Sequence, residues 1–311
     1  MLGLRRHRKK SAGVVGIALG RDGAAAIRLR SGGRDELPRL TAGTRLPAAD
    51  SETLAETLED WVDAAGAAGM AANLVLAPGE YQLLQIEAPA VPASEIRQAA
   101  AWRIRELIDY PIDQAVVDTF EPPEAAQRGQ PNVNVVVAHR AIVAERIGQI
   151  RAAGLRLGAI DIPELAQGVV SERLPEARGG HALLALDEGD GLITVYRDGQ
   201  QFLARTLDSG RVDVATDHGG AAFEPLLLEI QRSFDYFESA LSQPPLGALY
   251  LYPPDDAVDA LARSAESNLG GVMCRSIALA DLATVEEEPS VADATMLRAV
   301  GVALRDLGES S

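Results

Sequence analysis

The 311-residue chain has little of several residue types, and each scarcity narrows its class. It holds a single cysteine, Cys274, which excludes an intrachain disulfide and favours a reducing compartment, the cytoplasm. No apolar run approaches the roughly 20 residues that a membrane-spanning helix needs. The N-terminus lacks the long apolar segment of a signal peptide. Aromatic residues make up only 4% of the chain, so we expect a core built mainly of alanine, leucine and valine.

Lysine is almost absent as well. The only two, Lys9 and Lys10, lie in a basic N-terminal segment together with Arg5, Arg6 and Arg8. The net charge is −16, and setting aside these five cations leaves −21 for the rest of the chain. Because such an acidic body repels phosphates, we do not expect a nucleic-acid partner. The basic segment suits the anionic inner face of a membrane, at roughly 1 kcal/mol per cation; a solvated terminus is the alternative.

Two stretches of the chain share one pattern. Residues 13–30 (GVVGIALGRDGAAAIRLR) read as a strand, a glycine turn and a second strand, and residues 182–199 (ALLALDEGDGLITVYRDG) repeat this order. A shift of 169 residues places Gly20 on Gly189. Glycine turns that gather backbone N–H groups can hold an anion such as a nucleotide phosphate. The repeat therefore predicts a duplicated fold with a cleft between its halves, although two unrelated hairpins would read similarly.

Apolar periodicity predicts the remaining elements. We expect helices over 52–65, 94–110, 141–153, from 163, and over 224–242, 257–268 and 292–306. We expect further strands over 73–77, 81–86, 115–119, 133–138, 156–161, 201–206, 248–252 and 272–277. Small groups of strands separated by long helices are typical of a mixed α/β protein.

Four further stretches carry a resemblance to a known family. They read PASEIRQAAAWRIRELIDYPIDQAVVDTF (92–120), AHRAIVAERIGQIRAAGLRLGAIDIPELA (138–166), EIQRSFDYFE (229–238) and LRAVGVALRD (297–306). Together with the two hairpins, and in this order, they resemble the PilM group of type IV pilus assembly proteins, and within it the MSHA-pilus biogenesis branch. The resemblance covers the chain from about residue 13 to 306.

The resemblance implies a duplicated, two-lobed α/β fold of the actin-like (ribonuclease H-like) kind, with a small subdomain inserted in the first lobe. The expected divisions are a basic tail (1–12), a first lobe (13–178) with the insertion at about 74–138, a second lobe (179–306) and a short tail (307–311). The resemblance also implies a cytoplasmic scaffold, peripheral to the inner membrane and part of the pilus assembly platform. Such a scaffold captures the cytoplasmic tail of a PilN-like membrane protein beside the inserted subdomain. We expect residues 92–120 to line that groove, with Arg97, Arg103 and Tyr110 as candidates for partner binding.

The resemblance also implies a nucleotide cleft, with ATP and Mg²⁺ as possible ligands. Ala18 stands where the family's phosphate loop carries an acid that helps to position the metal, and hard cations need oxygen ligands. Tyr252 is followed by two prolines where a glycine pair is expected near the adenosine, and proline has no N–H donor. The candidate residues for a residual nucleotide site are Gly16, Gly20, Asp187 and Gly189.

Loss of several such elements predicts a pseudo-ATPase, because phosphoryl transfer depends on positioning and charge stabilisation. An active ATPase or small-molecule kinase is the alternative, and polymerisation into actin-like filaments is a third possibility. The four histidines are scattered without metal-ligand spacing, so we expect neither a metal site nor catalytic residues.

Overall fold

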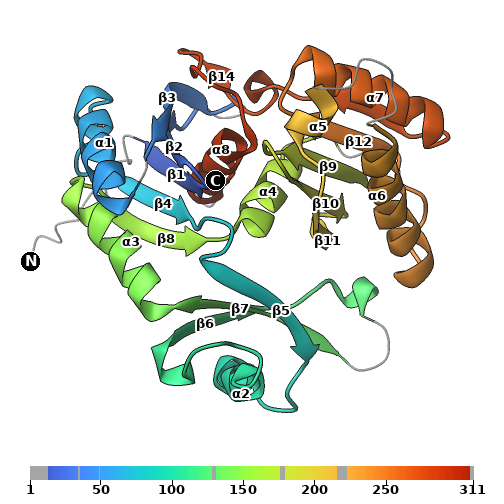
Figure 1. Ribbon diagram of the computed structural model, residues 1–311, viewed down its shortest axis with the longest axis horizontal. Coiled ribbons are helices and arrows are strands. Elements are labelled where there is room, and N and C mark those ends of the chain that lie inside the picture. Colours follow the sequence, from blue (N-terminus) through green and yellow to red (C-terminus); the bar gives the residue numbers. More distant parts are fainter. Residues whose placement is uncertain are drawn as a thin grey trace, which may run out of the picture.

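Three β-sheets form the framework of the protein. The computed structural model describes residues 13–33, 36–48, 50–127, 131–175, 179–215 and 223–308. The basic N-terminal segment, two of the histidines and the last three residues lie outside the described residues. Two larger sheets lie side by side, and the smallest sheet lies below both (Figure 1). Within the described chain, no helix is long and apolar enough to cross a bilayer.

The two larger sheets share one topology. The first contains, in spatial order, β14 (Thr284–Val285), β3 (Arg39–Pro47), β2 (Gly23–Arg30), β1 (Val14–Gly20), β4 (Ala71–Val75) and β8 (Arg156–Asp161). The second contains β11 (Gln200–Leu207), β10 (Gly191–Arg197), β9 (His181–Leu186), β12 (Ala248–Tyr252) and β13 (Met273–Ser276). Apart from β14, each sheet combines a meander of three antiparallel strands with two further strands. These two strands lie beside the first strand of the meander and run parallel to it. The predicted duplication is therefore present in the strand order.

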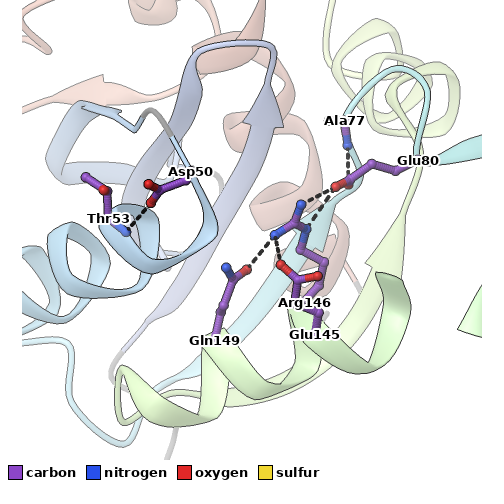
Figure 2. Close-up of polar contacts among 7 residues, drawn as sticks. All are labelled: Asp50, Thr53, Ala77, Glu80, Glu145, Arg146 and Gln149. Atoms are coloured by element: carbon purple, nitrogen blue, oxygen red, sulfur yellow. Dashed lines mark hydrogen bonds and ion pairs between the residues drawn. The ribbon is translucent and has the colours of Figure 1, made fainter. Parts of the chain in front are cut away.

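Helices cover the outer faces of both sheets (Figure 1). α1 (Ser51–Ala64) and α3 (Arg140–Ala152) pack on the first sheet, and α6 (Phe223–Asp235) and α7 (Asp256–Asn268) pack on the second. α1 begins where it does because the Asp50 carboxylate accepts the N–H of Thr53 at 2.8 Å (Figure 2). β1 is covered on both faces, which explains its continuous apolar run.

Two helices fill the space between the larger sheets: α4 (Pro163–Ser171) and α8 (Ala294–Gly308) (Figure 1). α4 follows the first sheet in sequence but packs on β9 and β10, whereas α8 ends the described chain and packs on β1 and β2. A Cβ on Gly16 would lie 2.0 Å from the carbonyl oxygen of Ala299, and one on Gly301 would lie 2.1 Å from that of Ala166. Glycine at these two positions lets the backbones of β1, α8 and α4 touch.

The inserted subdomain contains the third sheet. It consists of β5 (Tyr81–Glu87), α2 (Ile96–Ile104), β6 (Ala115–Phe120) and β7 (Asn132–His139), and the strand order is β5-β7-β6. α2 covers the face of this sheet that is turned away from the larger sheets (Figure 1). The subdomain has its own apolar core: Ala100, Ile104, Ile108, Ala115, Val133, Val135 and Val137.

Two helices are shorter than the sequence predicts. The helix expected to reach Pro111 ends at Ile104, and Leu107 is 57% exposed rather than part of a buried stripe. A turn after Ile104, in which the N–H of Leu107 donates to the carbonyl of Ile104, redirects the chain. α6 ends at Asp235 and continues as a π-helical turn, Tyr236–Ala240, which keeps both Phe237 and Leu241 buried. β3, which lies in a range expected to be a connection, α5 (Arg211–Ala215) and β14 were not expected.

Candidate functional site

The first candidate site is the cleft between the two halves. The β1–β2 turn and the loop after β9 face each other across a cavity of about 130 Å³. Gly20, Asp187 and Gly189 line it, whereas Gly16 lies further down β1 against α8. Pockets that hold small molecules typically measure about 300–1,000 Å³. The structure thus brings three of the four expected residues together around a cavity too small for a nucleotide.

Ion pairs cross this cleft. Arg21 and Asp190, which meet at 2.5 Å, are 169 residues apart, so this pair joins equivalent turns of the two repeats. Two further pairs, each at 2.7 Å, connect α8 and the segment before it to the cleft: Arg298 with Asp187, and Arg45 with Asp293. Arginine side chains therefore neutralise Asp187 and Asp293 of the lining and Asp190 beside it, whereas Asp22 and Glu188 of the lining have no arginine partner among the described residues.

Of the two positions where the family's phosphate loops carry an acid, only Asp187 is acidic in this chain. Its carboxylate pairs with an arginine of the same protein. Its partner Arg298 has a side chain that is only 4% exposed. Burial raises the pKa of Asp187 above its ordinary value, and the Arg298 guanidinium opposes that rise. Two backbone carbonyls of the same loop also accept hydrogen bonds: the N–H groups of Arg211 and Val212 donate to the carbonyls of Asp187 (2.7 Å) and Glu188 (2.9 Å).

The other positions of the cleft are filled by apolar packing. Ala18 is fully buried in β1, in the core that β1 shares with α8. Tyr252 and Pro253 are buried too, and neither lines the cavity. The Tyr252 hydroxyl has no hydrogen-bond partner among the described residues. No group of three or more His, Cys, Asp or Glu side chains in the described chain could hold a metal ion.

The described cysteine and one described histidine, Cys274 and His139, make contacts that stabilise the fold. Cys274 is buried in β13, and burial raises the pKa of its thiol to about 12, which disfavours the nucleophilic thiolate. His139 precedes α3, where its Nδ1 accepts the N–H of Ala141 at 3.1 Å, and its ring packs edge-on against Tyr110.

The second candidate site is a groove of about 770 Å³ between the inserted subdomain and the two larger sheets. We call it the acidic groove. The β6–β7 connection, α4 and the β10–β11 turn contribute most of its lining. Its charged members are Glu121, Glu124, Asp161, Glu172 and Arg305, and its apolar members are Phe120, Pro122, Pro123, Pro131, Leu165 and Val169.

The carboxylates of the acidic groove fall into two classes. Asp161 is paired with Arg305 at 2.7 Å; burial raises the pKa of Asp161, and Arg305 opposes the rise. Glu172 accepts a hydrogen bond from the Tyr196 hydroxyl at 2.7 Å. Glu121 and Glu124 are exposed, and no cation of the described residues pairs with either. The groove therefore presents uncompensated negative charge beside apolar surface.

Polar contacts at the root of the inserted subdomain fix the position of this groove. Arg146 of α3 binds Glu80, which precedes β5, and also donates to Gln149 at 3.0 Å (Figure 2). The Tyr81 hydroxyl donates to Glu164 of α4 at 2.8 Å. Both chain connections of the subdomain lie beside these contacts, so the third sheet is held against α3 and α4.

The residues expected to bind a partner lie elsewhere. Arg97 is 4.0 Å from Asp118, the Arg103 guanidinium donates to the carbonyl of Glu87 at 3.2 Å, and Tyr110 packs on His139. None of the three candidates lines the acidic groove, and of the expected range 92–120 only Phe120 does so among the described lining residues.

Comparison with known proteins gives a clear result for the fold. No family model matches the sequence, and no curated protein matches it. A solved structure described as a PilM–PilN type IV pilus biogenesis complex is similar to the chain with a TM-score of 0.70 and 20% identity, over 94% of this chain and 98% of that one. The chain has an actin-like fold.

Two other solved structures support this statement. The cytoplasmic domain of EpsL, an inner-membrane component of the type II secretion system of Vibrio cholerae, matches with a TM-score of 0.51 and 14% identity, over 94% of this chain and 95% of that one. A Bacteroides thetaiotaomicron protein of unknown function with an actin-like ATPase fold matches with a TM-score of 0.50 and 10% identity, over 91% and 96%. The predicted fold class and the likeness to PilM are thereby confirmed.

Sequence reasoning missed the residues that give both sites their electrostatics. Arg298 lies in the quoted stretch 297–306, but nothing in that stretch indicates that it pairs with Asp187. Glu121 and Glu124 belong to a segment that reads only as a polar, proline-containing loop. A search for acids without nearby basic residues would have found these two, because 120–127 contains no cation.

Proposed function

We propose that this protein is a cytoplasmic scaffold of a type IV pilus, peripheral to the inner membrane, which captures the cytoplasmic tail of a PilN-like membrane protein in the acidic groove. The likeness to the structure of a PilM–PilN complex supports the class of partner. The MSHA-type assignment, in which the protein is similar to MshI, rests on the sequence resemblance. In this proposal the basic segment 1–12 approaches the anionic membrane surface, and the lobes span residues 13–178 and 179–306.

The observation that carries the proposal is the charge of the acidic groove. Cytoplasmic segments next to membrane-spanning helices are enriched in lysine and arginine. A groove whose lining holds four carboxylates and one arginine complements such a tail, and its prolines, Leu165 and Val169 offer contacts for apolar side chains. Its volume of about 770 Å³ is sufficient for several peptide residues.

The closed cleft supports a role without nucleotide turnover. A nucleotide would have to displace Arg298 from Asp187 and separate Arg21 from Asp190 before its phosphates could enter. In this proposal the protein is a pseudo-ATPase, and the arginines hold together the halves that Mg²⁺ and phosphates join in an active enzyme of this fold.

The rival is an ATP-binding enzyme, since Gly20, Asp187 and Gly189 do surround one cavity. It requires that Mg-ATP raise the melting temperature and that Asp187→Asn abolish the shift. Our proposal expects no change in melting temperature at millimolar Mg-ATP. A shift that depends on Asp187 would favour the rival.

Tail binding is tested with a fluorescent peptide carrying the cytoplasmic segment of a PilN-like partner, titrated with the whole protein. We expect saturable binding at micromolar concentrations. The double variant Glu121→Gln/Glu124→Gln should weaken binding roughly threefold to tenfold, because it removes two exposed charges without changing side-chain shape.

The matched control is Glu95→Gln/Glu106→Gln, which removes two exposed charges from the α2 region and leaves the acidic groove intact. This control should bind like the parent protein. Absence of binding at tens of micromolar, or equal weakening by both double variants, would contradict capture of the tail in the acidic groove.

A further inference from the structure

The acidic groove continues into a second groove of about 490 Å³. The two share four lining residues: Phe120, Pro122, Gln127 and Gln201. The second groove lies between the third sheet, through β5 and β7, and β11 with the turn after α6. Because they share these residues, the two grooves adjoin and form one channel between the inserted subdomain and the second of the larger sheets.

The second groove carries no charged residue, and we call it the neutral groove. Its lining is Leu83, Leu84, Gln85, Phe120, Pro122, Ala126, Gln127, Asn132, Asn134, Gln201, Phe202, Leu203, Ala204, Tyr236, Ala240 and Leu241. In a chain of which 24% is charged, a lining of this length without one charge sets the surface apart from the acidic groove. Its five side-chain amides can each donate and accept hydrogen bonds, as the peptide groups of an extended chain do.

An open sheet edge borders the neutral groove. β11 is the end strand of the second sheet, and β5 is an end strand of the third. Among the described residues, β11 is paired only with β10 and β5 only with β7. An end strand presents N–H and C=O groups that an extended peptide can pair with as an added strand.

Gln201 lies where the two grooves meet. Its Oε1 is buried and has no hydrogen-bond partner among the described residues. The side chain is held against Gly168 of α4, where an added Cβ would lie 2.5 Å from this oxygen. A buried acceptor without a donor is costly, and a bound peptide N–H would satisfy it once the side chain turned from Gly168 toward the groove.

We propose that the neutral groove binds an extended, uncharged stretch of the same tail whose basic residues occupy the acidic groove, with this stretch pairing along the outer edge of β11. This inference rests on the proposed function. The continuity of the two grooves selects one peptide as occupant, and the change from carboxylates to amides along the channel sets the order of its residues: a basic cluster next to an uncharged run.

The test uses a displayed library of random 16-residue peptides, selected on the whole protein. We expect enriched peptides to carry a cluster of two or more Lys or Arg adjacent to at least four uncharged residues. Hydrogen exchange with a selected peptide should slow at the amides of 200–207. Selection of basic clusters without the uncharged run, or no added protection in β11, would overturn the neutral-groove proposal and leave the acidic groove intact.

Variants separate the two halves of the channel. Gln85→Arg places a charge in the neutral groove at an exposed position and should weaken a selected peptide at least about fivefold. Gln98→Arg makes the same change on the exposed side of α2, outside the channel, and should have no effect. Gln201→Leu should weaken the peptide roughly twofold to tenfold through the lost acceptor.

A peptide truncated to its basic cluster should bind Gln85→Arg and the parent protein equally. If Gln85→Arg weakens nothing while Glu121→Gln/Glu124→Gln does, the neutral-groove proposal fails and the proposed function stands. If selection enriches no peptide, or the double variant changes nothing, the proposed function fails first.

Discussion

The cleft and the acidic groove both have carboxylates around a cavity, but they differ in how many of these carboxylates pair with an arginine. In the cleft, Asp187, Asp190 and Asp293 each have an arginine within 2.7 Å, only the exposed Asp22 and Glu188 of the described lining have none, and the cavity is about 130 Å³. In the acidic groove, Glu121 and Glu124 have no such partner among the described residues, and the cavity is about 770 Å³. Charge that is neutralised internally holds a fold together, whereas charge left exposed beside apolar surface is available to a partner.

The largest effect should come from breaking the pair at the centre of the cleft. Arg298→Ala leaves the Asp187 carboxylate partly buried without its partner, and such losses destabilise proteins by about 3–5 kcal/mol. Arg39→Ala removes one partner of an exposed pair with Glu286 and should cost less than about 1 kcal/mol. Chemical denaturation of both variants measures the difference. Equal costs would show that the cleft pairs are no more structural than those on the surface.

Glycine substitutions sharpen the same contrast between packing and ligand binding. Gly301→Ala drives a methyl group against the carbonyl of Ala166 and should destabilise the protein by about 1–3 kcal/mol. Gly189→Ala, in the loop expected to hold phosphate, meets no atom within 4 Å and should leave the melting temperature nearly unchanged. A strong destabilisation by Gly189→Ala would show that this loop is more constrained than its surroundings indicate.

Half-buried Glu164, which joins α4 to the inserted subdomain through Tyr81, gives a pH-dependent contrast. Burial raises its pKa above the ordinary value of 4.5, so the folded state retains a proton that the unfolded state releases. Its contribution to stability is therefore lost as pH rises from the unfolded pKa through the folded one. Glu164→Gln keeps an oxygen that accepts from Tyr81 and removes the ionisation. Its unfolding free energy relative to the parent should increase with pH over that window, and a difference independent of pH would contradict this reasoning.

The smallest expected effect is the salt dependence of tail binding in the acidic groove. Raising ionic strength from about 0.05 M to about 0.5 M shortens the screening length severalfold and weakens interactions between exposed charges. Binding of a PilN-like tail in the acidic groove should weaken accordingly, and the double variant Glu121→Gln/Glu124→Gln should show a smaller salt dependence. An equal dependence for variant and parent would place the tail's charge contacts outside this groove.

Most strands of the framework, though not β3, were predicted from the sequence because their pattern is local. Buried strands such as β1 and β9 are short apolar runs ended by glycine turns, and the 169-residue repeat copies that pattern. α5 and β14 have five and two residues, too few to show a period. The length of α6 was misjudged because a π-helical turn buries Phe237 and Leu241 much as a continuing α-helix would.

The candidate site was less predictable because its chemistry comes from distant parts of the chain. Ala18 and the prolines after Tyr252 signalled a changed cleft, but the Arg298–Asp187 pair joins residues far apart in sequence. The carboxylates of the acidic groove come from the β6–β7 connection, the end of β8 and the end of α4, with no spacing that would connect them. They converge only because α4 crosses to the second sheet and the inserted subdomain lies below it.

Hydrogen exchange on one sample, with the PilN-like tail peptide and with Mg-ATP in turn, tests the central claim most directly. The tail should slow exchange in 120–127, 165–172 and 196–204, and Mg-ATP should leave the 20–23 turn and the 187–190 loop unchanged. Protection of those two turns by Mg-ATP, with no response of the channel to the tail, would contradict the account.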